Sequence, residues 1–338
     1  MTMEYVNLGR TGVKVSKLCL GTMMFGRSTS EQDSIPIIEY ALDQGINFID
    51  TANIYANGLS ETIVGKVLSK NNRRERTILA TKVFFHMDKN DPNAGGISRR
   101  HIISACEQSL KRLQTDWIDL YQMHRPQADI PIDESLRALD DLIRAGKVRY
   151  LGSSMFPGWR LVECLWAAKE LGLNRIVCEQ STFHLLDRTA EREVLPAARS
   201  YGLAVISWGP LCGGLLSGKY RRDDVSAAGR WQGGKDNLGR VATARAFDVI
   251  EVLLDIAARK ACTASQLAIA WNAAQPGITA PIIGPRLLAQ LQDNLGALAV
   301  KLDESDFREL DAVAPPMSAS LRYYDVANGL DLRPNVYR

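Results

Sequence analysis

The sequence lacks the patterns that mark metal-binding, membrane-spanning or nucleic-acid-binding proteins. Its 338 residues include only four histidines and six cysteines, with no HExxH motif, no CxxC pair and no zinc-like spacing. No apolar run approaches the ~18 residues of a membrane span, and the first ten residues contain no apolar stretch typical of a secretory signal. The net charge of +3 gives no strong attraction to nucleic acid or anionic membranes.

These absences favour a globular protein of the cytoplasm. Hydrophobic residues make up 46% of the chain, which is enough apolar material for a large core. The cysteines are expected to be buried free thiols in a reducing compartment; they are Cys19, Cys106, Cys164, Cys178, Cys212 and Cys262. We therefore expect no metal ion, no nucleic-acid partner and no insertion into a membrane.

Two common nucleotide-binding motifs are also missing. No GxGxxG follows a strand-like segment, so a Rossmann domain is not indicated. The stretch "GGLLSGKY" at residues 213–220 resembles a phosphate-binding GxxxxGK[ST] loop, but Tyr220 stands where the magnesium-binding hydroxyl is required. This excludes a nucleoside triphosphatase, although Lys219 can still contact a phosphate as a point charge.

Strand-like and helix-like segments alternate along the chain after a predicted β-hairpin within residues 1–16. The strand-like segments are residues 17–21, 46–50, 77–82, 117–124, 148–154, 175–180, 203–211 and 278–284. Eight successive β–α units predict a parallel sheet closed into a (β/α)8 TIM barrel, here as one domain over residues 1–338. Ser60 is expected to cap the helix that follows the second strand.

Two long loops, 84–97 and 212–240, follow strand-like segments, and a tail at 314–338 ends the chain. In a barrel of this kind the loops that follow strands lie at the C-terminal face, where active sites are built. We therefore expect both loops at the mouth of the active site.

The stretch "FIDTANIYANG" brings an acid and a phenol close together. Asp50 ends a strand-like run and Tyr55 follows five residues later, in the same loop. Asp50 by itself is equally typical of a turn or a helix cap. Asn53 and Asn57 are interpreted as turn residues.

Two further ionisable residues end the next two strand-like runs. These are Lys82 and His124, and each follows an apolar run in which an unpaired charge is costly. Alone, the lysine is typical of a solvated charge and the histidine of a structural residue. Neighbouring strands of a barrel end at the same mouth, however, so we expect both side chains to meet Asp50 and Tyr55 there.

These four side chains together suit proton delivery to a carbonyl oxygen. A phenol with a pKa of about 10 is a weak acid, and a nearby Lys82 ammonium is expected to lower that pKa. Asp50 pairs with Lys82, and His124 can hydrogen-bond the substrate oxygen. No side chain can supply a hydride, so a reduced cofactor is implied.

Four motifs in this order resemble the aldo-keto reductase superfamily over nearly the whole chain. They are "DTANIY", "IDLYQMHRP", "ALDDLIRAGKVRYLGSS" and "IIGPRLLAQLQDNLGAL". The segments "GGISRRHIISACEQSLKRLQTDWIDLY" and "CEQSTFHLLDR" are most similar to the branch with voltage-gated potassium channel β subunits and bacterial relatives. The resemblance implies a barrel that binds NADP(H) without a Rossmann domain and reduces small-molecule aldehydes or ketones. It also implies Tyr55 as general acid, assisted by Lys82, Asp50 and His124.

The resemblance further implies a set of cofactor contacts. The loop after the first strand and the end of the second strand correspond to Gly21, Thr22, Met23 and Asp50. At the nicotinamide, the carboxamide site corresponds to Ser154, Met155 and Gln180, and the stacking aromatic to Trp208. The pyrophosphate segment corresponds to Gly209, Pro210, Leu211, Cys212 and Lys219, and the adenosine-phosphate end to Gly284, Arg286, Gln290 and Asn294. Trp208 could instead be a core aromatic. Arg230 is either a residue that closes over the cofactor or a solvated loop arginine.

Two departures from the family pattern concern the cofactor site. Met155 stands where asparagine is usual, and a thioether cannot replace the amide's donors and acceptor. Gly209 replaces a common serine, which removes one side-chain contact to the pyrophosphate. The nicotinamide carboxamide is therefore expected to be held less firmly than in the family, or by Ser154 and Gln180 alone.

Three functions remain open at this point. The first is a carbonyl reductase, the second a regulatory subunit that binds NADP(H) and turns over slowly, and the third an unrelated barrel enzyme acting on a phosphorylated substrate. Aromatic residues of the loops and tail either line a substrate pocket or pack the loops; they are Phe84, Phe85, Trp231, Tyr323 and Tyr324. The sequence leaves open the substrate, homo-oligomer formation and the preference between NADPH and NADH.

Overall fold

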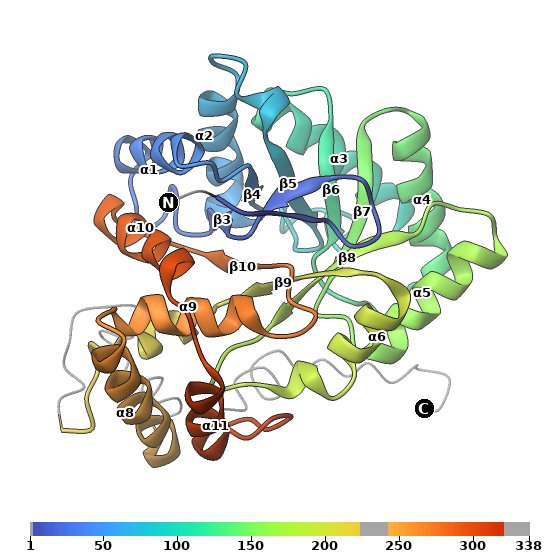
Figure 1. Cartoon of the computed structure of the whole chain (residues 1–338). Helices are drawn as coiled ribbons and strands as arrows, with labels where there is room; N and C mark the ends of the chain where they lie inside the picture. The colour runs from blue at the N-terminus through green and yellow to red at the C-terminus, as the bar shows by residue number, and fades with distance from the viewer. Residues whose placement is uncertain (1–2, 224–242, 321–338) are drawn as a thin grey trace.

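Eight parallel strands close into a barrel in the computed structural model, which describes residues 3–223 and 243–320 (Figure 1). The strands are β3 (Cys19–Gly21), β4 (Phe48–Asp50), β5 (Ile78–Val83), β6 (Ile118–Met123), β7 (Val148–Ser154), β8 (Ile176–Thr182), β9 (Ala204–Trp208) and β10 (Ala280–Ile283). Each pairs with its neighbour in sequence, and β10 closes on β3. This confirms the predicted (β/α)8 barrel.

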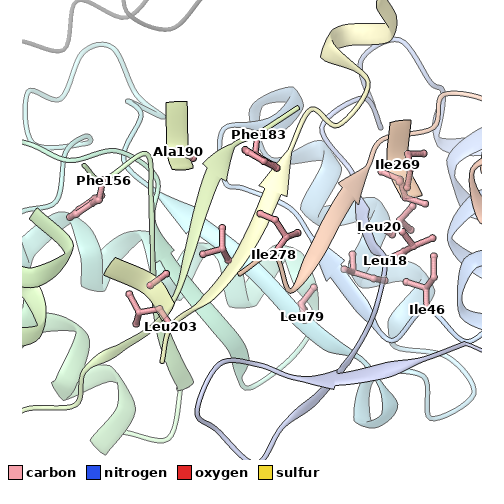
Figure 2. Packing of buried hydrophobic residues seen from close by; sticks show 14 of the residues in the cluster. Leu18, Leu20, Ile46, Leu79, Phe156, Phe183, Ala190, Leu203, Ile269 and Ile278 are labelled. Carbon is pink, nitrogen blue, oxygen red and sulfur yellow. The ribbon is translucent and has the colours of Figure 1, made fainter. Parts of the chain in front are cut away.

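Helices surround the barrel on its outer side (Figure 1). They are α1 (Glu31–Asp43), α2 (Leu59–Leu68), α3 (Arg99–Leu113), α4 (Ile132–Arg144), α5 (Gly158–Glu170), α6 (Val194–Tyr201), α8 (Ala244–Arg259), α9 (Ala264–Ala274), α10 (Leu288–Leu295) and α11 (Glu304–Val313). Short 3-10 turns lie at Tyr55–Gly58, Arg74–Arg76, Thr189–Glu191, Cys212–Ser217 and Gly296–Ala299. The helices bury their apolar faces against the strands (Figure 2).

Two local predictions are wrong. Ser60 does not cap α2, which begins at Leu59 after Gly58; its hydroxyl instead donates to the Thr22 carbonyl at 2.9 Å. The seventh strand ends at Trp208 rather than at residue 211, because Gly209 adopts a φ of 69° that a strand cannot continue through.

The N-terminal hairpin closes one end of the barrel. Its strands, β1 (Tyr5–Asn7) and β2 (Lys14–Ser16), pair antiparallel and place Leu8 and Val15 in one cluster with apolar side chains of the barrel interior. Gly9 fits there because a Cβ would lie 2.7 Å from the backbone nitrogen of Ala204. The hairpin and the inward apolar residues fill the N-terminal half of the barrel, which leaves the C-terminal mouth for polar groups.

The alternation of side chains along each strand decides which residues face that mouth. On β5, Leu79 belongs to the cluster between barrel and helices, whereas Ala80 belongs to the interior cluster. Lys82 comes two residues after Ala80 and therefore also faces inward. The same parity turns Asp50 inward from β4, two residues after the interior Phe48.

Helix α2 packs closely against the end of α3 at Gly65. A Cβ at this position would lie 2.6 Å from the carbonyl oxygens of Arg112 and Leu113. These are backbone atoms, so the overlap can be relieved only by moving one helix.

We expect Gly65→Ala to destabilise the protein, although alanine is the better helix former by about 1 kcal/mol. Overpacking against backbone costs about 1–3 kcal/mol and outweighs that gain. Urea denaturation should show a lower midpoint for this variant. Gly12→Ala is the matched control, since a Cβ there meets no atom within 4 Å; equal stability of the two variants would contradict the close-packing argument.

Candidate active site

A fully buried lysine is the centre of the polar layer at the barrel mouth. The Lys82 ammonium donates to Asp50 Oδ2 at 2.5 Å, to the Thr51 carbonyl at 2.8 Å and to the Tyr55 hydroxyl at 3.1 Å. An ammonium has three donors and no acceptor, so these bonds use all of them. Burial alone would lower the pKa of Lys82, but Asp50 and Tyr55 reverse this, and the net direction is upward. Lys82 therefore remains charged.

Asp50 is fixed from three other strands. Its Oδ2 accepts from Lys82, and its Oδ1 accepts from the side-chain amides of Gln122 at 3.1 Å and Gln180 at 2.8 Å. Gln122 lies on β6 between Tyr121 and Met123, and sequence reasoning missed it. An inward-facing glutamine two residues before His124 was the available signal. The carboxylate is thus a bonded partner of the lysine, as predicted, and not a helix cap.

The Tyr55 hydroxyl accepts a hydrogen bond from Lys82, so its own proton must point elsewhere. The pKa of the phenol is raised above its usual value, because burial outweighs the opposing effect of the Lys82 ammonium. The expectation from the sequence did not include this effect of burial on the Tyr55 pKa. Lys82 still acts in the predicted direction, and the phenol is protonated at neutral pH.

His124 follows β6 directly and lies beside Tyr55. Their ring centroids are 5.9 Å apart at 80°, and the Phe85 ring packs edge-on against the imidazole at 5.0 Å. Burial and the Lys82 charge hold the pKa of His124 well below its usual value, so the ring is neutral. Its Nδ1 is buried without a hydrogen-bond partner among the described residues. Phe85 is thus a residue of this site, whereas Phe84 packs against the outer core.

The neighbouring asparagines differ from the turn interpretation in one respect. Asn57 has a φ of 53°, as expected for a turn. Asn53 is 1% exposed, and neither atom of its amide has a partner within the described part of the chain. A buried, unsatisfied amide is costly, so Asn53 is more than a solvated turn residue.

The loop after β3 contributes the path of its backbone to the site more than side-chain hydrogen-bond donors. Gly21 is required because a Cβ would lie 2.6 Å from Ile282 Cγ2. Thr22 is fully buried, with its hydroxyl bonded to the Asp50 carbonyl at 3.1 Å. Met23 is the partly exposed residue of the three predicted here.

The β7 and β9 ends meet across the mouth. Ser154 is buried at the end of β7, and Met155 follows with a φ of 62°, a left-handed conformation that methionine rarely adopts. The Met155 sulfur accepts a hydrogen bond from the Trp208 indole N–H at 3.4 Å. Trp208 is partly exposed, so it is not a buried core aromatic. Gln180, assigned to the same place, bonds both Asp50 and Gln122.

Beyond Trp208 the chain contains a tight turn and, further on, the side chain of Lys219. Positive φ values at Gly209 and Cys212 fold residues 209–212 into a tight turn that includes Pro210 and Leu211. Burial, and to a lesser degree the Arg286 charge, lowers the pKa of Lys219.

The β10 end completes this side of the mouth. Gln290 accepts from the Arg286 backbone N–H at 2.8 Å and fixes the turn before α10. A Cβ at Gly284 would meet no atom within 4 Å, and Asn294 is buried one turn along α10. Such an arrangement suits an extended anionic ligand, because Arg286 and Lys219 are cations that phosphate groups can pair with.

Some predicted residues lie outside the described ranges: Arg230, Trp231, Tyr323 and Tyr324. Among the described residues, no group of three or more histidine, cysteine or carboxylate side chains could hold a metal ion. Within the same ranges, no helix is both long and apolar enough to cross a membrane. The cysteines are free thiols as predicted, but Cys212 and Cys262 are partly exposed rather than buried.

Most of the chain is similar in sequence to known proteins. Residues 17–315 match the model of the Aldo/keto reductase family. An uncharacterized oxidoreductase of Bacillus subtilis, YrpG, is 44% identical over 330 residues, covering 93% of this chain and 96% of the relative.

Two eukaryotic relatives are more distant. A probable voltage-gated potassium channel subunit beta of Arabidopsis thaliana is 34% identical over 303 residues, covering 88% of this chain and 92% of that protein. A versiconal hemiacetal acetate reductase of Aspergillus parasiticus is 32% identical over 336 residues, covering 91% of this chain and 96% of that protein. These relatives confirm the predicted branch.

The Asp50–Lys82 pair yields a stability prediction. Asp50→Asn and Lys82→Met should each cost about 3–5 kcal/mol, because each leaves a buried charge without its partner. The double variant should cost less than the sum of the two, since it leaves neither charge. Denaturant unfolding of all four proteins measures this coupling, and additive losses would contradict a mutually dependent pair.

Proposed function

We propose that this chain, which belongs to the aldo/keto reductase family, is an NADP(H)-dependent reductase that converts aldehydes or ketones to alcohols. As a member of that family it is an oxidoreductase, which sets aside the unrelated barrel acting on a phosphorylated substrate. The proposal adds the cofactor, the direction of reaction and the residues that perform it.

The observation that carries the proposal is the hydrogen bond from Lys82 to the Tyr55 oxygen. Because the ammonium can only donate, it forces the phenolic proton away from Lys82. A protonated phenol at the barrel mouth, whose O–H does not point toward Lys82, can act as a general acid for a carbonyl oxygen.

The other residues of the site support that role. As negative charge develops on the phenolic oxygen, the Lys82 ammonium 3.1 Å away stabilises it. Asp50 keeps the ammonium charged and in place. The neutral imidazole of His124 can donate one hydrogen bond to the substrate oxygen and so orient the carbonyl. Phe85 packs edge-on against the imidazole and adds an apolar surface to this part of the site.

NADPH, when bound, supplies the hydride that no side chain can provide. The chain fits such a cofactor along the mouth, with Ser154, Met155 and Trp208 at the nicotinamide end. The turn at residues 209–212, which follows Trp208, is proposed to lie beside the pyrophosphate. Arg286 suits the extra phosphate that distinguishes NADP(H) from NAD(H), and Lys219 suits the pyrophosphate as a point charge.

A second candidate function is a regulatory subunit that binds NADP(H) and turns over slowly. The similarity to a probable potassium channel β subunit over 88% of this chain favours it. The complete proton-donor arrangement around Tyr55 favours the reductase. Tight cofactor binding without turnover on any carbonyl in a broad panel would support the regulatory role instead.

Replacement of the proposed acid tests the mechanism directly. Tyr55→Phe should reduce kcat for carbonyl reduction by about 10²–10⁴-fold, because the proton donor is removed. Its NADPH affinity, measured by quenching of tryptophan fluorescence, should stay near the wild-type value. Tyr150→Phe, on β7 beside the interior apolar cluster, is the control and should retain activity. Full activity of Tyr55→Phe would refute the assignment.

The unusual Met155 gives a prediction of opposite sign. Met155→Asn should bind NADPH more tightly, because an amide can hold the carboxamide and asparagine tolerates a φ of 62° better than methionine. Met155→Leu keeps the backbone strain and removes only the sulfur contact to Trp208, so it serves as the control. Unchanged or weaker NADPH binding by Met155→Asn would exclude an underheld carboxamide.

A further inference from the structure

Glu179 is a buried acid that the proposed chemistry does not use. It lies on β8, is 0% exposed and faces outward from the barrel, opposite in direction to its neighbour Gln180. Its carboxyl group accepts from the Ser153 hydroxyl at 2.5 Å and from the Phe156 backbone N–H at 3.1 Å. A carboxyl group placed between barrel and helices is costly, and apolar residues would fill that layer at no such cost.

The two groups that Glu179 bonds lie on either side of a strained turn. Residues 153–156, which we call the 153–156 turn, contain Met155 in the left-handed region at a φ of 62°. That conformation is unfavourable for a non-glycine residue, because its Cβ comes too close to the following carbonyl oxygen. The Met155 N–H donates to the Gln180 carbonyl at 2.9 Å. Consecutive residues of β8 therefore hold the turn at its centre and at both sides.

The conformation of this turn decides where two side chains of the mouth lie. Ser154, which follows Ser153 on β7, faces inward, and the Met155 sulfur contacts the Trp208 indole. Without the bonds from Ser153 and Phe156 to a common carboxyl group, the turn can relax toward an ordinary φ. Ser154 and Met155 would then leave the positions assigned to the nicotinamide end.

We propose that Glu179 is a positioning residue for the nicotinamide end of the cofactor site, acting through the 153–156 turn. This inference rests on the proposed function, because that function assigns Ser154, Met155 and Trp208 to the nicotinamide.

The surroundings of Glu179 add a dependence on pH. Burial raises the pKa of Glu179 to about 8, against the lowering effects of Ser153, the Phe156 and Met155 N–H groups and the Arg125 charge. Two further titratable neighbours are Cys164 and Cys178, whose own pKa values are raised by burial so that both stay neutral. Glu179 therefore changes charge near pH 8 while these neighbours do not.

The sign of the expected pH effect follows from the charge of the cofactor. The oxidised nicotinamide ring is a cation and the reduced ring is neutral, so an ionised Glu179 favours NADP+ over NADPH. The ratio of the Kd of NADPH to the Kd of NADP+ should therefore rise several-fold as pH increases through about 8. Using the ratio removes titration of the phosphates, which the two cofactors share.

The experiment measures both Kd values from pH 6 to 9.5 by quenching of tryptophan fluorescence in three variants and the wild type. Glu179→Gln keeps the size of the neutral acid and should bind as the wild type does at pH 6.5, but with a ratio independent of pH. Glu179→Ala should raise both Kd values by roughly tenfold. The control is Glu61→Gln, another fully buried glutamate, bonded to Thr81 and Arg112 on α3; it should lower stability and keep the wild-type pH profile.

Each outcome decides the question. A wild-type ratio without an inflection near pH 8, or an inflection that Glu179→Gln retains, overturns the proposed effect of the Glu179 charge on the nicotinamide end. Unchanged Kd values in Glu179→Ala overturn the positioning role, and if that variant fails to fold, the Glu179→Gln profile decides. A wild-type protein that binds neither cofactor refutes the proposed function itself, and this inference with it.

Discussion

A single buried charge, the Lys82 ammonium, sets the requirements for the rest of the site. The ammonium is buried away from solvent, so three hydrogen-bond acceptors must surround it. These acceptors come from the end of β4 and the loop that follows. One acceptor, Asp50, must in turn be satisfied, and amides from β6 and β8 do this. Residues at the ends of four strands therefore have to meet for the charge to be tolerated, and the closed barrel brings them together. The chemistry of Tyr55 depends on that arrangement, because Lys82 determines where the phenolic proton points.

The same barrel separates stability from function along its axis. The hairpin and inward apolar residues fill the N-terminal half, and the larger apolar cluster lies between strands and helices (Figure 2). The polar side chains of the proposed site take inward positions at the C-terminal ends of the strands. Glu179 departs from this rule, since it is a carboxyl group in the outer layer. Its bonds lead directly to the turn after β7, which gives a reason for an otherwise costly burial.

Strain at the mouth is concentrated where ligand contacts are proposed. Met155 and Cys212 both adopt positive φ values in turns after strands β7 and β9. Such conformations persist only when surrounding bonds hold them, and for Met155 those bonds come from Gln180 and Glu179. A relaxed loop at this position would place Ser154 less firmly, so the strain has a functional interpretation.

The sequence by itself determined the barrel, because eight β–α units leave a parallel sheet few ways to close. It also identified Asp50, Lys82 and His124, because each follows an apolar run, and it placed Tyr55 in the loop after Asp50. It could not determine how burial and neighbouring charge balance at Tyr55, where burial outweighs the lowering of the pKa by Lys82. It also missed Gln122 and Glu179. Their roles depend on the direction in which each side chain leaves its strand and on the residues that it then meets. Contacts such as that between Asp50 and Gln180 join residues far apart in the chain. Only the tertiary structure decides those contacts, because hydrogen bonds form between side chains that the fold brings within about 3 Å.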